Sequence, residues 1–140
     1  MSSKRDPIRV LLVNCSEDER LMYSDYLRFD GVETLEAADV AAATTLATTE
    51  RPDVVVTDLG VPSEADGLQL IRSLRSHGAT TEVPIIVVSG RVFAIEQQRA
   101  FEAGCDVFLP KPLLPDALAH EVRRTVAAKR RATFKADEAQ

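Results

Sequence analysis

The chain has 140 residues, of which 45% are hydrophobic and 28% are charged, and its formal net charge is -5 at pH 7. This length and composition fit one globular domain, and they exclude a fibrous or wholly disordered chain. The negative charge argues against nucleic-acid binding, and no apolar stretch is long enough for a signal peptide or a membrane span, so we expect a cytoplasmic protein without a membrane partner.

The first half of the chain alternates short apolar runs with helical stretches. Strands are predicted at residues 8–13, 32–37 and 54–57, because uninterrupted Val-rich and Ile-rich runs are typical of strands buried on both faces. A helix is predicted at about 18–29, with an inward face of Met22, Tyr23, Tyr26 and Leu27. Another helix follows Asp39, its expected N-cap, and ends before Pro52.

The second half continues this alternation. A loop after Asp58 leads to a helix that we expect to open at Gly67 and to end near Gly78. Two strands and two helices follow, with the strands at residues 84–89 and 107–109 and the helices at 92–103 and 115–130. The predicted organisation is an N-terminal tail at 1–7, one domain at 8–129 and a flexible C-terminal tail at 130–140.

Five strand and helix units in alternation predict an α/β fold, a doubly wound parallel sheet with helices on both faces. In such sheets the ligand site lies beyond the carboxyl ends of the strands. The residues at those ends therefore carry the candidate chemistry, and they are Asn14, Cys15, Asp58, Ser89 and Lys111.

Three segments at these strand ends resemble the receiver domain of two-component response regulators. They read "VVVTDLGVPSEADG", "PIIVVSGR" and "EAGCDVFLPKPL", in the order typical of the family, and the resemblance extends over about residues 8–128. It implies a flavodoxin-like five-stranded sheet of order 2-1-3-4-5 with five helices. It also implies that an Asp after the third strand takes a phosphoryl group from a partner histidine kinase.

The resemblance assigns a role to each matching residue. Asp58 is the expected phospho-acceptor, and Lys111 and Ser89 are expected to stabilise the phosphoryl group. Ser89 and Phe108 are the expected switch residues, and the Lys111–Pro112 peptide bond is expected to be cis. A carboxylate is a competent nucleophile toward phosphorus, and a cation must offset the approach of one anion to another.

The chain departs from the family pattern directly after the first strand. The family has two acidic residues there that help to hold Mg²⁺, whereas this chain has Asn14 and Cys15. An amide oxygen and a neutral thiol are poor ligands for Mg²⁺, so we expect Mg²⁺ binding to be weak or absent. A partial site from Asp58, the backbone carbonyl of Gly60 and Glu17 stays open, although Glu17 also suits the first turn of a helix.

The leading hypothesis is therefore a single-domain, non-enzymatic receiver in a phosphorelay. Its expected partners are a histidine kinase or phosphotransfer protein and a downstream protein bound by the face of the fourth helix, fifth strand and fifth helix. A phosphorylation-independent pseudo-receiver that acts as an adaptor is the main alternative, and homodimerisation is left open. A flavodoxin-like cofactor carrier is a remote alternative, because the acidic stretch "NCSEDER" repels phosphate.

Overall fold

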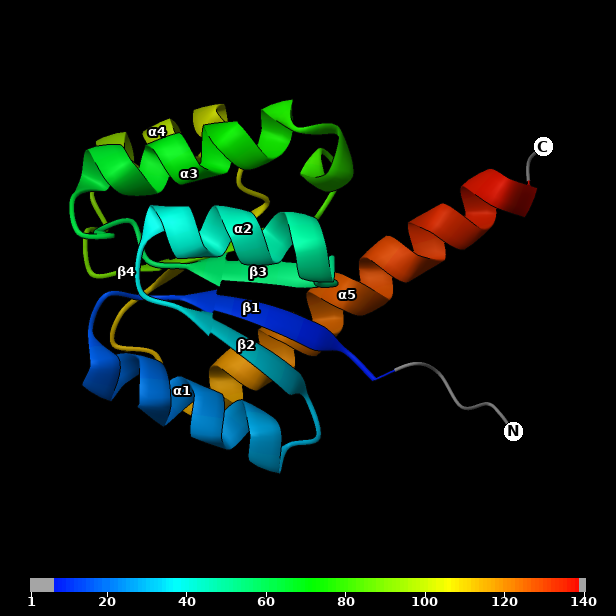
Figure 1. The fold of residues 1–140 in the computed structure, drawn as a ribbon, viewed down its shortest axis with the longest axis horizontal. Helices are drawn as coiled ribbons and strands as arrows, with labels where there is room; N and C mark the ends of the chain where they lie inside the picture. Colours follow the sequence, from blue (N-terminus) through cyan, green and yellow to red (C-terminus); the bar gives the residue numbers. More distant parts are fainter. Residues whose placement is uncertain (1–6, 139–140) are drawn as a thin grey trace.

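The structure is a computed structural model that describes residues 7–138. Its five strands are parallel and form one sheet in the order β2-β1-β3-β4-β5 (Figure 1). The strands are β1 (Arg9–Val13), β2 (Glu33–Ala37), β3 (Val54–Thr57), β4 (Ile85–Ser89) and β5 (Val107–Pro110). This order confirms the predicted flavodoxin-like fold.

Five helices cover the two faces of the sheet (Figure 1). One face carries α1 (Glu17–Phe29) and α5 (Pro115–Glu138), and the other carries α2 (Val40–Glu50), α3 (Glu64–Ser76) and α4 (Ala94–Ala103). A single 3₁₀ turn, η1 (Gly78–Thr80), follows α3. Within residues 7–138, none of the helices combines the length and the apolar character that crossing a membrane requires.

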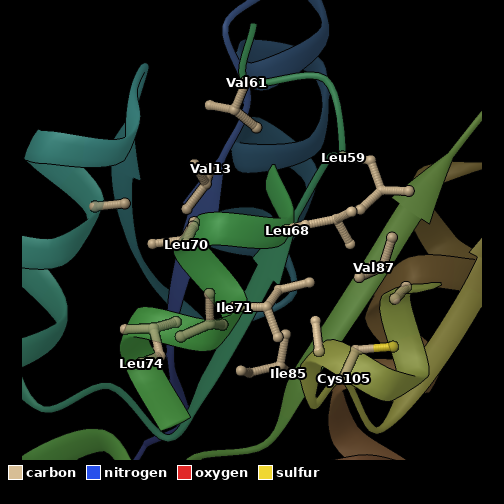
Figure 2. Packing of buried hydrophobic residues seen from close by; sticks show 14 of the residues in the cluster. Val13, Leu59, Val61, Leu68, Leu70, Ile71, Leu74, Ile85, Val87 and Cys105 are labelled. Carbon is tan, nitrogen blue, oxygen red and sulfur yellow. The ribbon is translucent and has the colours of Figure 1, made fainter. Parts of the chain in front are cut away.

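The strands are apolar throughout because both faces of the sheet are buried. Successive strand residues point to opposite faces, so Leu11 and Val13 pack under α2, α3 and α4, whereas Val10 and Leu12 pack under α1 and α5. Figure 2 shows the first of these two clusters, to which α3 contributes Leu70, Ile71 and Leu74. Because the sheet is fixed by two cores, the carboxyl ends of its strands form a rigid edge.

The start of α3 differs from the prediction. The helix begins at Glu64, one turn before Gly67, because Ser63 and Asp66 form a reciprocal capping box. Gly67 instead lies where the helix passes close to the chain after β3, and a Cβ atom there would lie 2.0 Å from the carbonyl oxygen of Leu59. Residues 64–66, which were predicted to lie in the loop, thus form the first turn of the helix.

Two further boundaries and faces differ from the prediction. The inward face of α1 consists of Tyr23, Ser24 and Leu27, whereas Met22 is 45% exposed. The last helix was predicted to end near Lys129, but it continues to Glu138, because its final turns hold good helix formers and no Gly or Pro. Its end projects from the body of the domain (Figure 1). Residues 1–6 and 139–140 of the predicted tails lie outside the described residues.

Candidate functional site

The ends of β3 and β5 position the two central residues of the site. The N–H of Asp58 donates to the carbonyl of Val13 at 3.1 Å, and the N–H of Lys111 donates to the carbonyl of Ser89 at 2.9 Å. These bonds continue the pairing of the sheet by one residue beyond the strands. The Lys111–Pro112 peptide bond is cis, as expected.

The side chains of Lys111 and Asp58 are in direct contact. The Nζ atom of Lys111 lies 2.5 Å from Oδ2 of Asp58 and 2.8 Å from Oε1 of Glu19. The three side chains are only 17 to 27% exposed, so water screens these contacts less than it screens a surface ion pair. One ammonium group therefore contacts two carboxylates that come from different elements, Glu19 from α1 and Asp58 from the end of β3.

Glu19 is the site residue that sequence reasoning missed. Besides Lys111, its Oε1 atom accepts a hydrogen bond from the amide Nδ2 of Asn14 at 2.6 Å. The sequence held a signal, because Ser16 and Glu19 have the spacing of a capping box. Ser16 does accept from the N–H of Glu19, but the carboxylate of Glu19 turns to Asn14 and Lys111.

These contacts oppose the effect of burial on two ionisable groups. Burial alone would raise the pKa of Glu19, but hydrogen bonds from Lys111 and Asn14 outweigh it and lower that pKa below its ordinary value. Burial alone would lower the pKa of Lys111, but its bonds to Asp58 and Glu19 outweigh this effect and raise it. Both groups are therefore charged at neutral pH. Two carboxylates against one ammonium group give this cluster a net negative charge.

Ser89 and Phe108 lie beside this cluster rather than in it. Ser89 is buried, and its hydroxyl accepts a hydrogen bond from the N–H of Arg91 at 3.0 Å. Phe108 is half-buried in β5 and packs against the core under α2, α3 and α4. The structure thus places Ser89 at the same sheet edge as Lys111 and Asp58, and it places the ring of Phe108 against the core.

Comparison with known proteins identifies the family. The model of the response regulator receiver domain matches residues 10–123. The chain belongs to this family. Receiver domains are signalling modules of two-component systems.

Curated relatives support the assignment of the receiver domain. This chain is 32% identical over 118 residues to the transcriptional regulatory protein YxdJ of Bacillus subtilis, a match that covers 84% of this chain and 50% of that protein. It is 36% identical over 117 residues to the response regulator MprA of Mycolicibacterium vanbaalenii, covering 84% and 49%. The chain spans about half the length of the curated relatives that it matches.

Solved structures share the fold of this receiver domain. The chemotaxis response regulator CheY4 of Vibrio cholerae superposes with a TM-score of 0.79 at 27% identity, over 86% of this chain and 99% of that one. The receiver domain of the sensor histidine kinase PA1611 from Pseudomonas aeruginosa superposes with the same TM-score at 24% identity, over 87% and 99%. That structure is described with a magnesium ion coordinated in its active-site cleft.

In this receiver domain, Asn14 and Cys15 occupy the two positions after β1 and contact other protein groups. Both ends of the Asn14 amide are engaged, since Oδ1 accepts from the N–H of Ser16 at 2.8 Å and Nδ2 donates to Glu19. The thiol of Cys15 donates to the carbonyl of Gly60 at 3.3 Å. Glu17 is exposed and bonds to none of the described side chains. Across residues 7–138, no three Asp, Glu, His or Cys side chains converge as a metal site.

Proposed function

We propose that this receiver domain accepts a phosphoryl group at Asp58 from a histidine kinase or phosphotransfer protein and then signals by contact with another protein. The observation that carries the proposal is the 2.5 Å contact between Lys111 Nζ and Asp58 Oδ2 at the carboxyl edge of the sheet. This contact holds a carboxylate nucleophile and a cation side by side where the family places its phosphorylation site.

The chemistry requires no proton on Asp58. A carboxylate oxygen of Asp58 forms a bond to phosphorus while the bond between phosphorus and the donor nitrogen breaks. The electron pair of that bond stays on the donor imidazole. Lys111 already contacts Oδ2 and has a third N–H with which it can reach a phosphoryl oxygen, and Ser89 lies at the same edge with its hydroxyl. We therefore assign Lys111 and Ser89 to stabilising the phosphoryl group.

We further propose that phosphorylation depends only weakly on Mg²⁺. Asn14 and Cys15 supply no negative charge, and the carboxylate of Asp58 has an ammonium group as its counter-charge. The Oε1 atom of Glu19 also accepts hydrogen bonds from Lys111 and Asn14. This oxygen is therefore already engaged and does not add to a set of oxygen ligands for a hard cation.

The proposed output is a protein contact through α4, β5 and α5. α4 and the loop before it expose four large apolar side chains, namely Val92, Phe93, Ile95 and Phe101. Exposed apolar side chains of this size are typical of a surface that a partner covers. In this proposal Ser89 and Phe108 report the state of Asp58 to that surface, since both lie on the strands that lead to it.

The experiment that tests acceptance by Asp58 is intact-mass spectrometry after incubation with a small phosphodonor and Mg²⁺. We expect the wild type to gain the mass of one phosphoryl group. Asp58→Asn keeps the size of the side chain but removes the nucleophile, and it should gain none. A wild type that stays unmodified, or a variant that is modified equally, would contradict the proposal.

A phosphorylation-independent adaptor is the second candidate. The observation that favours it is the network of Asn14, Glu19, Lys111 and Asp58, in which each of these side chains already has a hydrogen-bond partner. This alternative predicts that the wild type and Asp58→Asn bind the same partner equally well, with or without a phosphodonor. A cofactor carrier has less support, because the first turn of α1 carries Glu17, Asp18 and Glu19, which repel a phosphate group.

A further inference from the structure

The carboxylate of Glu19 lies where no phosphoryl chemistry requires one. It sits in the first turn of α1, yet its Oε1 atom contacts the same Lys111 nitrogen that contacts Asp58. Both oxygens are within 2.8 Å of that nitrogen, so they can be no further apart than the sum of the two contact distances. Any anion that approaches Asp58 must therefore also approach Glu19.

The surroundings hold Glu19 in this place. Asn14 donates to the same oxygen at 2.6 Å, and the backbone of Asn14 is fixed by a hydrogen bond from its N–H to Ala37 O at 3.0 Å. The nearest arginine in sequence, Arg20, does not neutralise Glu19, because its guanidinium bonds to Glu36 and to the carbonyl of Asn14. Lys111 is thus the one cation of the described residues that pairs with Glu19.

This arrangement has two consequences for an incoming phosphoryl group. Lys111 has three N–H donors, and Glu19 takes one of them away from the reacting oxygens. Two carboxylates against one ammonium also leave the site with a net negative charge, which repels an anionic donor. Both effects act in the same direction, and neither needs a metal ion.

We propose that Glu19 is a positioning residue that restrains phosphoryl transfer to Asp58 by holding Lys111 and by repelling the anionic donor. The inference rests on the proposed function, since it concerns how fast Asp58 accepts the group. Its role is electrostatic and acts through Lys111, so it differs from a residue that merely keeps the helix in place.

The test compares the initial rate of phosphoryl gain of three proteins under the conditions of the Asp58→Asn experiment. Glu19→Gln removes the charge but keeps the shape and an oxygen that accepts from Asn14. Glu17→Gln is the matched control, because it removes the same charge from the same helical turn at an exposed position, where Glu17 forms no ion pair with another residue of the range 7–138. We expect Glu19→Gln to be about tenfold faster than the wild type, the size of effect for one nearby charge in a partly hydrated site, and Glu17→Gln to be unchanged.

Ionic strength supplies a readout that a structural role would not move. At about 1 M salt, screening acts within roughly 3 Å, which weakens the repulsion of the approaching donor but not the direct contact between Glu19 and Lys111, so the ratio of the Glu19→Gln rate to the wild-type rate should fall without reaching one. An equal or slower rate for Glu19→Gln, an equal acceleration by Glu17→Gln, or a ratio that salt does not change would each overturn the inference while leaving the acceptor role of Asp58 intact. If neither the wild type nor Glu19→Gln gains a phosphoryl group, the proposed function fails and the inference fails with it.

Discussion

Lys111 is the residue on which the site depends. Two of its three N–H donors are used by Asp58 and Glu19, and these bonds keep its pKa above the ordinary value in spite of partial burial. A lysine that stays cationic across the neutral range can offset the charge of a carboxylate nucleophile. Among residues 7–138, Lys111 is the cationic side chain that pairs with Asp58, and the two positions after β1 hold the uncharged side chains of Asn14 and Cys15.

The two cysteines differ in reactivity, and this difference is testable. Burial raises the pKa of Cys105 to about 12, so its thiol stays neutral and shielded, whereas Cys15 is exposed at the site. We expect a thiol-alkylating reagent at mildly alkaline pH to label one cysteine in the folded protein and both after unfolding. Peptide mapping should place the first label on Cys15, and Cys15→Ser should abolish labelling of the folded protein. Labelling of Cys105 in folded Cys15→Ser would contradict this assignment.

The strand-end residues could be predicted from the sequence, whereas Glu19 could not. Asp58 and Lys111 directly follow apolar runs, and parallel strands bring such residues to one edge. The side-chain direction of Glu19 depends on the angle at which α1 leaves the sheet and on the reach of Lys111 from the far side of β3. The spacing of nearby residues indicates neither the angle of α1 nor the reach of Lys111. The acidic residues of this turn were therefore interpreted as an ordinary helix start.

At the scale of elements, the approach of α3 to the chain after β3 sets the geometry of the loop beside Asp58. Gly67 permits this approach, because a Cβ atom would overlap the backbone of Leu59, which is itself buried. Backbone atoms cannot move aside as a flexible side chain can. The glycine is therefore required for packing in the first turn of α3, although its position suggested a helix start.

We expect Gly67→Ala to lower the free energy of unfolding by about 2 to 4 kcal/mol, in spite of the better helix propensity of alanine. Gly78→Ala is the matched control, since a Cβ atom at Gly78 meets no atom within 4 Å, and its effect should stay below about 1 kcal/mol. Denaturant unfolding of both variants measures the difference. Equal stabilities for the two variants would show that α3 can shift away from Leu59 without cost.

The elements whose limits were predicted well are those fixed by strong local signals. The N-cap of α2 is an example, since Asp39 accepts from the N–H of Ala42 at 2.8 Å as expected. The starting point of α3 was misjudged because a glycine was given more weight than the Ser63 and Asp66 capping box. The length of α5 was misjudged because its last turns leave the core, and burial no longer indicates where such a helix ends.

At the scale of the whole molecule, the order of the strands places residues that are far apart in the sequence next to one another. β1, β3, β4 and β5 follow one another in the sheet, and this brings together residues from position 14 to position 111 at one edge. The fold class was predictable because alternating strands and helices with right-handed crossovers allow few arrangements, whereas the family was predicted from the resemblance of three strand-end segments. The relatives are about twice as long as the matched region, so the predictions of a receiver without an output domain and without nucleic-acid binding stay predictions.

The central claim is that Lys111 rather than a divalent cation offsets the charge of Asp58. Its most direct test is the rate of phosphoryl gain, followed by intact mass with a fixed phosphodonor, as Mg²⁺ is varied from a chelated solution to saturation. We predict a change of less than about tenfold for the wild type. The double variant Asn14→Asp with Cys15→Asp restores two carboxylates and should acquire a marked dependence on Mg²⁺. A wild type that gains no phosphoryl group until Mg²⁺ is added would contradict the account.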